Sequence, residues 1–150
     1  EVSLEELGKQ LGMSKNTVER YLDLLSKVFV VFKIGGFSRN LRKEIVKNSR
    51  WYFYDNGVRN AIIRNFNRLD LRADIGELWE NYLAVERLKF HNYNHMHCNN
   101  YFWRTYDQQE IDWVEEEGDK LRAYEFKYQS GKPSKVPGAW AKAYSHASYE

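Results

Sequence analysis

The sequence predicts a mixed α/β (α+β) protein. Three observations support this fold class: two short helical patterns near the N-terminus, one long amphipathic helical pattern in the middle, and several short runs rich in β-branched and aromatic residues. Hydrophobic residues make up 43% of the chain and aromatic residues 16%, which excludes a disordered protein. The 150 residues are enough for a sizeable core, in one domain or in two small ones.

The first part of the chain has the pattern of a helix-turn-helix. Ser3 followed by Glu6 is a capping-box signal, and leucines then recur at helical spacing up to Gly12. Ser14 caps a second helical pattern. Two short helices joined by Gly-Met-Ser are typical of a helix-turn-helix.

An extended segment follows and completes a winged-helix prediction. Residues 28–34 form a strand that ends at two glycines, residues 51–54 form a second strand, and a basic connector between them is the expected wing. We expect this module to bind duplex DNA through side chains on the outer face of the second helix and on the wing. The expected DNA-binding residues are Lys15, Asn16, Arg20, Arg39, Arg42, Lys43 and Lys47. Winged helices also mediate protein contacts, and Glu19 and Asp23 dilute the basic face, so protein binding remains an open alternative.

A linker around residues 65–72 divides the chain, and we place two domains at residues 1–70 and 71–150. The first carries 13 Lys and Arg against 8 Asp and Glu, whereas the second carries 10 against 13. A basic surface beside a carboxylate-rich one suits phosphate attraction next to a metal site. The elements expected after the linker are a helix, a strand, a hairpin with Gly118 in its polar turn, and a closing helix: residues 73–90, 101–106, 110–114, 121–128 and 136–146.

The hairpin gathers polar residues. Because strand side chains alternate faces, Asp112 shares a face with Glu110 and lies opposite Trp113. On the facing strand Glu125 and Lys127 likewise share one face. If the two polar faces coincide, carboxylates and one ammonium converge on a patch that suits a hard cation such as Mg²⁺, with the lysine left to position an attacking water.

Asp112 followed by Glu125-Phe126-Lys127 resembles the D…E-x-K signature of the restriction-endonuclease-like (PD-(D/E)XK) nucleases. The resemblance implies a restriction-endonuclease-like domain with a glutamate on the preceding helix, for which Glu80 is the best match and Glu77 the second. It also implies a catalytic set of Glu80, Asp112, Glu125 and Lys127, with Mg²⁺ or Mn²⁺ held by the three carboxylates and DNA as the substrate.

The segments 52–57 and 101–112 look, more narrowly, like the C-terminal region of a bacterial and archaeal family of AAA-type P-loop ATPases, a region labelled a domain of unknown function. This resemblance implies that ATP binds in an N-terminal region that the sequence lacks, because no Walker-type motif occurs here. It implies the ATPase domain of the same full-length chain as a partner. Similar nuclease-like folds add a strand after the closing helix, so we expect that strand to be missing at Glu150 or the sheet to be smaller.

Two functions follow from these observations. The first is a DNA-associated, Mg²⁺-dependent nuclease, and the alternative is a non-catalytic DNA- or protein-binding module that serves the ATPase. A transcription-factor-like role of the winged helix is a weaker third reading. No nucleophile elbow or glycine-rich phosphate loop supports small-molecule catalysis.

The remaining signals concern metal and location. His91, His95, His97 and Cys98 include potential Zn²⁺ ligands, but they have no second ligand pair at a recognised spacing, which favours an ordinary surface loop. Arg104 is expected to pair across the sheet. No apolar run is long enough to cross a bilayer, and one cysteine excludes an internal disulfide, so we expect a cytoplasmic protein without a membrane partner.

Overall fold

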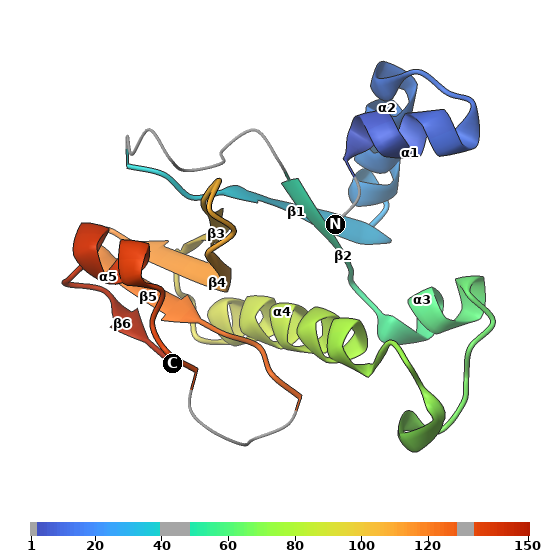
Figure 1. Cartoon of the computed structure of the whole chain (residues 1–150). Helices are drawn as coiled ribbons and strands as arrows, with labels where there is room; N and C mark the ends of the chain where they lie inside the picture. The colour runs from blue at the N-terminus through green and yellow to red at the C-terminus, as the bar shows by residue number, and fades with distance from the viewer. Residues whose placement is uncertain (1–2, 40–48, 129–133) are drawn as a thin grey trace.

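The computed structural model describes residues 3–39, 49–128 and 134–150. Within these ranges the chain folds around one mixed sheet, with helices on its two faces and a helical pair at one end (Figure 1). The mixed α/β class is therefore confirmed. In chain order the elements are α1 (Leu4–Leu11), α2 (Lys15–Lys27), β1 (Val31–Gly36), β2 (Ser49–Phe53), α3 (Asn56–Ile62), the 3₁₀ turn η1 (Leu69–Leu71), α4 (Ile75–Tyr93), β3 (Asn99–Arg104), β4 (Glu110–Glu117), β5 (Lys120–Tyr124), α5 (Gly138–Ala143) and β6 (Ser148–Tyr149).

Both N-terminal helices begin where their sequence signals predict. The Ser3 hydroxyl accepts the Glu6 backbone N–H at 3.1 Å, and the Glu6 carboxylate accepts the Ser3 N–H at 2.9 Å, which is a complete capping box. Ser14 caps α2, and Gly12 ends α1 in the left-handed conformation with φ 64°. Gly8 has no room for a side chain, because a Cβ there would lie 2.7 Å from the Met13 carbonyl oxygen. The helix-turn-helix pair is thereby held close.

The sheet crosses the domain boundary expected at residue 70. Its strand order is β2-β1-β3-β4-β5-β6, with β1 and β3 paired in parallel through Gly35 opposite Tyr101. The strands expected as the hairpin of a separate winged helix therefore form one edge of a sheet shared with residues 71–150. The two parts of the chain share one structural framework. The expected wing residues Arg42, Lys43 and Lys47 lie outside the described residues.

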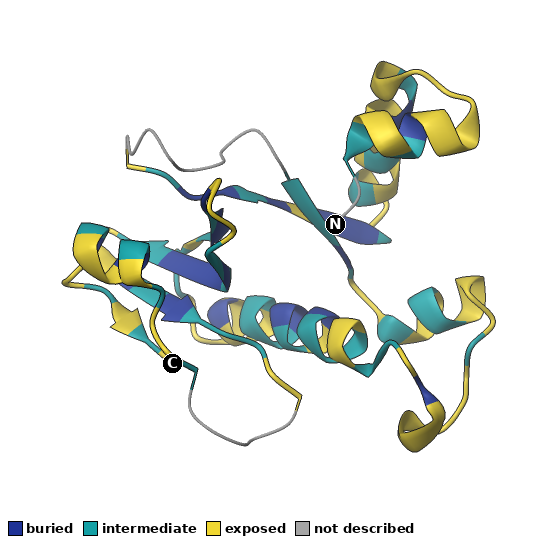
Figure 2. Cartoon of the chain, in the orientation of Figure 1, coloured by how far each residue is buried: buried dark blue, intermediate teal, exposed yellow. Residues whose placement is uncertain are grey.

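Two cores cover the two faces of the sheet. On one face Trp140 of α5 packs on Trp103 and Ile111, and Phe37 from the end of β1 joins them. On the other face α4 packs through Ala84 and other residues against side chains of four strands: Phe32, Ile34, Tyr52, Phe102 and Trp113. Figure 2 shows buried residues concentrated on the strands and on the sheet side of α4. Residues from both halves of the sequence contribute to both cores.

A β-bulge interrupts β4 at Asp112 and Trp113. Trp103 pairs with Ile111 and Tyr101 pairs with Val114, so two residues of β4, Asp112 and Trp113, lie opposite one residue of β3. Both side chains consequently face α4, because Asp112 binds partners on that side and Trp113 lies in the α4-side core. The sequence prediction that these two residues lie on opposite faces is wrong, because it assumed an uninterrupted strand.

The remaining differences concern where β4 and β5 end and the presence of a further strand. β4 continues through Glu117 and turns tightly at Gly118, whose φ is 60°, so Glu115 and Glu116 are strand residues rather than turn residues. β5 ends at Tyr124, so Glu125 and Lys127 follow the strand instead of extending it. The short strand β6 pairs in parallel with β5 and supplies the strand expected to be missing. Among the described residues no helix is long and apolar enough to span a membrane.

Candidate functional site

Arg50, on β2, lies at the centre of the expected carboxylate cluster. Its Nη1 donates hydrogen bonds to Glu80 Oε1 and to Asp112 Oδ1, both at 3.2 Å, and its Nη2 forms an ion pair with Glu110. The guanidinium also lies 5.0 Å from the ring centroid of Phe102. Only 10% of the Arg50 side chain is exposed. One buried cation thus neutralises carboxylates from α4 and from β4.

Burial and neighbouring charges shift the pKa values of this cluster. Burial raises the pKa of Glu80, and the Asp112 carboxylate adds to this rise against the opposing charge of Arg50. The hydroxyl of Tyr52 donates a hydrogen bond to Glu80 Oε1 at 2.8 Å. Burial opposes the charge on Arg50, but Tyr52, Glu80 and Asp112 outweigh it and the pKa of Arg50 is raised. The guanidinium therefore stays charged at every physiological pH.

The E-x-K segment lies directly beside Asp112. The backbone N–H of Phe126 donates a hydrogen bond to Asp112 Oδ2 at 3.0 Å. Lys127 Nζ lies 2.8 Å from Glu125 Oε1, and this hydrogen bond is the main reason that the pKa of Lys127 is raised. The structure thus places the backbone of the E-x-K segment against Asp112, and Arg50 joins Asp112 to Glu80.

The arrangement does not fit a bound Mg²⁺ ion as it stands. In the part of the chain that the structure describes, no three of the expected acidic ligands have oxygens within 4.8 Å of one another. Both oxygens of Asp112 already accept hydrogen bonds, one from Arg50 and one from Phe126. The cation that these carboxylates hold is the guanidinium of Arg50, and a metal ion would need to displace it.

A pocket of about 620 Å³ opens onto the cluster from the side of the helical pair. Its polar end contains Arg50, Glu80, Glu110 and Arg104, whose Nε lies 3.4 Å from Glu110 Oε2. Arg104 of β3 thus pairs with its cross-strand neighbour Glu110 of β4, as the sequence predicts. The apolar and remaining walls are formed by residues of α1, α2, β2, α3 and α4: Leu4, Leu7, Leu22, Ser49, Trp51, Tyr52, Phe53, Arg59, Glu77 and Asn81.

The expected DNA-binding residues that the structure describes are not gathered on one face. Lys15 pairs with Glu5 of α1 at 2.6 Å, whereas Arg39 lies at the far end of β1 and pairs with Glu116 of β4 at 3.0 Å. Figure 1 shows the helical pair and the end of β1 on opposite sides of the molecule. Asn16 and Arg20 are exposed on α2. The described residues therefore form no continuous basic stripe from α2 to the connector.

Sequence reasoning missed two site residues. Arg50 was assigned to the basic connector, although its place in β2 beside Tyr52 puts it against α4. Glu115 was assigned to a turn, yet it is fully buried on the α4 side of β4. The signal for Arg50 was the alternation of β2, which gives Arg50 and Tyr52 one face. No pattern in the sequence predicts the bulge in β4, after which the Glu115 side chain faces α4.

Comparison with known proteins divides the chain at the same place as the linker. Residues 1–69 match a family model described as a domain of unknown function (DUF8612), and residues 75–148 match another (DUF4143). Two uncharacterised proteins, from Mycobacterium bovis and Mycobacterium tuberculosis, are each 26% identical over 127 residues, which is 83% of this chain and 28% of the relative. The chain thus spans less than a third of these relatives' length. No solved structure matches it.

Proposed function

We propose that this chain is a non-catalytic interaction module that works with a AAA-type ATPase and binds it through α2. The domain of unknown function that matches residues 75–148 is found at the C-terminus of AAA-type ATPases, which supports an ATPase as the partner. The relatives are more than three times longer than the matched segment, which leaves room for an ATPase region. Two features of the described residues favour binding over catalysis.

The observation that carries the proposal is an apolar stripe on α2. Tyr21, Leu24, Leu25 and Val28 recur at helical spacing and are 56%, 56%, 39% and 66% exposed. Val28 is the C-cap of α2, and Phe29, the next residue, is 73% exposed. An amphipathic helix normally buries such a stripe, and exposed apolar clusters of this kind mark protein-binding surfaces.

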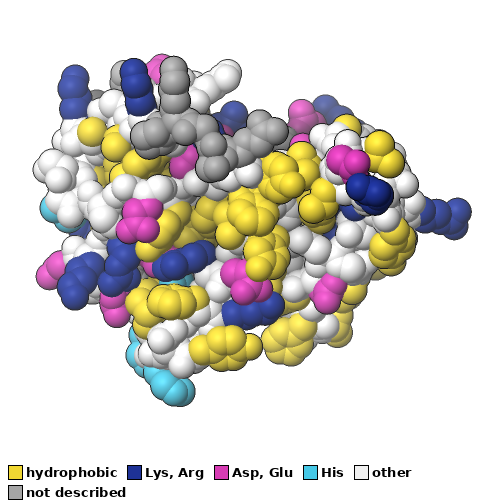
Figure 3. Space-filling model, turned by 90° about the horizontal axis from the view of Figure 1, so that it is seen from below, with side chains coloured by type: hydrophobic (Ala, Val, Ile, Leu, Met, Phe, Trp, Pro, Cys, Tyr) yellow, Lys and Arg dark blue, Asp and Glu magenta, His cyan; other side chains and the backbone are white. Residues whose placement is uncertain are grey.

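The charges of α2 agree with a protein partner better than with DNA. Lys15 pairs with Glu5, and Lys27 pairs with Asp23 at 2.7 Å on the same helix. These pairs reduce the positive charge available to phosphates, whereas duplex binding depends on unneutralised Lys and Arg. Hydrophobic side chains also reach the surface elsewhere: Figure 3 shows them gathered across the face seen from below, interrupted by single charged residues.

The second feature is that the carboxylate cluster is already paired with the cation of Arg50. Arg50 satisfies Glu80, Glu110 and Asp112 at once, which is the pattern of a structural ion-pair network. A catalytic metal site keeps at least one position open for water or substrate. The cluster therefore accounts for how β2, α4 and β4 are held together without requiring a reaction.

The binding proposal predicts a loss of partner affinity when the stripe is made charged. The double substitution Leu24→Glu and Val28→Glu should weaken binding to a separately expressed ATPase region of the full-length protein by at least about tenfold, since apolar contacts at an interface centre exceed about 1.4 kcal/mol. Affinity is measured by titration calorimetry. The matched control is Glu19→Lys, an exposed residue on the opposite side of the same helix, which changes charge away from the stripe and should bind normally. If the folded double variant binds as tightly as the native chain, α2 is not the interface.

A Mg²⁺-dependent nuclease is the second candidate, because Asp112 lies against the backbone between Glu125 and Lys127 as the D…E-x-K resemblance implies. Under the interaction-module proposal, the chain should leave labelled linear, nicked and branched DNA uncut with millimolar Mg²⁺ or Mn²⁺. Native protein is assayed beside Asp112→Asn and Lys127→Ala. Cleavage by the native chain that both variants lose would establish the nuclease and overturn the non-catalytic reading.

A further inference from the structure

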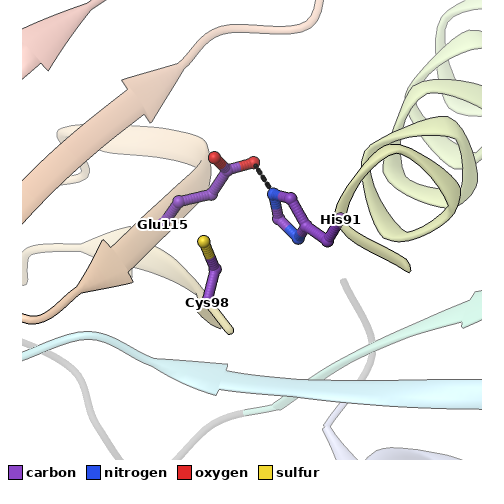
Figure 4. A group of neighbouring side chains, drawn as sticks. All are labelled: His91, Cys98 and Glu115. Atoms are coloured by element: carbon purple, nitrogen blue, oxygen red, sulfur yellow. Dashed lines mark ion pairs between the residues drawn. The ribbon is translucent and has the colours of Figure 1, made fainter. Parts of the chain in front are cut away.

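A second cluster of polar side chains lies on the α4 face, apart from Arg50 and its partners. His91 near the end of α4, Cys98 before β3 and Glu115 on β4 point toward one another (Figure 4). Their nearest potential ligand atoms all lie within 4.8 Å of one another, and His91 Nε2 lies 2.9 Å from Glu115 Oε1. Within the described ranges this is the single group of three such residues so close together.

Two local features of the fold assemble this cluster. The β4 bulge shifts the alternation of the strand, so Glu115 faces α4. At the end of α4 the chain reverses through His95, whose φ is 54°, and the Met96 N–H donates to the His91 carbonyl oxygen at 2.9 Å. This reversal returns Cys98 to the side of the helix that carries His91.

The His91 side chain is buried, but its ring lacks hydrogen-bond partners. The residue is 4% exposed, and neither of its ring nitrogens makes a hydrogen bond of good geometry, although Nε2 lies close to Glu115. Buried polar groups are nearly always hydrogen-bonded, so an imidazole in this state needs an explanation. A ring nitrogen aimed at a carboxylate and a thiol is arranged as a metal ligand would be.

The charged side chains that face the cluster neutralise one another. Arg87 donates to Glu115 Oε1 at 2.6 Å and to Oε2 at 2.7 Å, and Arg122 Nη1 lies 3.9 Å from Oε2. Arg122 also pairs with Glu117 at 2.7 Å, so these two arginines and two glutamates balance.

Glu115 is held firmly by its outer contacts. Besides Arg87, the indole Nε1 of Trp113 donates to Oε1 at 3.0 Å. Contacts of this kind orient a metal-binding carboxylate and fix its position. On metal binding the carboxylate would keep its Arg87 contact through Oε2, while Oε1 would exchange its contacts with Arg87 Nε and Trp113 Nε1 for the shared cation.

We propose that His91, Cys98 and Glu115 form a binding site for one Zn²⁺ ion, with a water molecule as the fourth ligand. Nitrogen, sulfur and oxygen ligands at about 2.0–2.3 Å are those that Zn²⁺ takes in proteins, usually four of them in a tetrahedron. Tetrahedral ligand atoms lie roughly 3.3–3.8 Å apart at these bond lengths, so small side-chain adjustments suffice. On binding, the Cys98 thiol loses its proton to solvent and the thiolate forms the Zn–S bond. The site is separate from the apolar stripe on α2 and from any Mg²⁺ site.

Co²⁺ titration of the metal-free chain tests this site without interference. Cys98 is the one cysteine of the sequence, so a thiolate-to-Co²⁺ charge-transfer absorption reports this site alone. We expect the band to saturate at one Co²⁺ per chain and to disappear when Zn²⁺ is added. No band at saturating Co²⁺ would overturn the proposal outright.

Single substitutions identify which side chains bind the metal ion. Cys98→Ser should abolish the band, and His91→Gln should weaken Co²⁺ binding by at least about tenfold, as loss of a ligand does. His95→Gln and His97→Gln are matched controls, since both histidines are exposed in the same loop, and they should bind as the native chain does. Loss of the band in His97→Gln but not in His91→Gln would place the metal on the loop surface and refute the buried site. Circular dichroism confirms that each variant is folded.

Discussion

Replacing Arg50 by methionine is expected to destabilise the protein by about 3–5 kcal/mol at pH 7, the range observed when one partner of a buried ion pair is removed. Methionine has a similar length but no charge, so Glu80, Glu110 and Asp112 would lose the cation they share. Arg104 can still pair with Glu110 but does not replace the contacts that Arg50 makes with the other two carboxylates. Urea denaturation of native and variant chains measures the difference.

The Arg50→Met loss should shrink as the pH falls. In the native protein burial already raises the pKa of Glu80 above its usual 4.5. A carboxyl whose folded pKa is raised contributes most stability below its unfolded pKa and loses that contribution as pH rises through the folded value. Removing Arg50 raises the folded pKa further, so the destabilisation at pH 5 should be smaller than at pH 7.

A matched control for this prediction is Arg68→Met. Arg68 pairs with Asp70, but the two side chains are 83% and 63% exposed. Exposed pairs contribute about 0–1 kcal/mol, so this variant should stay near the native stability at both pH values. If Arg50→Met behaves like Arg68→Met, the cluster does not hold β2 to α4 and the structural reading of Arg50 fails.

Local signals predicted the elements well because their causes lie within a few residues. The capping box at Ser3 and the left-handed Gly12 fix α1 without help from the rest of the chain. Gly118 marks the hairpin turn because its φ of 60° favours glycine. Hairpin pairing also brings the backbone N–H of Phe126 to Asp112, whereas a shared patch of the Glu125 and Lys127 side chains with Asp112 stays a prediction.

The site chemistry depended on contacts between distant residues and was not predictable from spacing. Arg50 and Glu110 are 60 positions apart, and only the joining of β1 to β3 brings them together. His91 and Glu115 meet because a bulge reverses the alternation of β4, and the polar run that contains Glu115 has the appearance of a turn. A buried glutamate in such a run is exceptional, because its burial requires Arg87 from another element.

The shared sheet leads to a second large expected effect, at Trp140. This residue is 1% exposed, and its ring lies 5.2 Å from Trp103 and 5.9 Å from Phe37, measured between centroids. Phe37 follows β1, and its N–H donates to the Phe102 carbonyl oxygen at 2.7 Å. Trp140 of α5 therefore packs against both halves of the sequence. Trp140→Ala should destabilise the fold by about 3–5 kcal/mol, as large cavities in aromatic cores do.

The test of one shared framework is whether the two halves unfold together in Trp140→Ala. Native-state hydrogen exchange should show the amides of β1 and β5 losing protection by the same amount, because β1 is anchored to β3 and to the core beneath α5. Tyr106→Ala serves as control, since Tyr106 is 69% exposed and its removal should change stability by less than about 0.5 kcal/mol. Persistent protection of β1 and β2 while β3 to β5 exchange would show that residues 1–70 fold as a separate domain, and the continuous sheet would then join two independent units rather than define one.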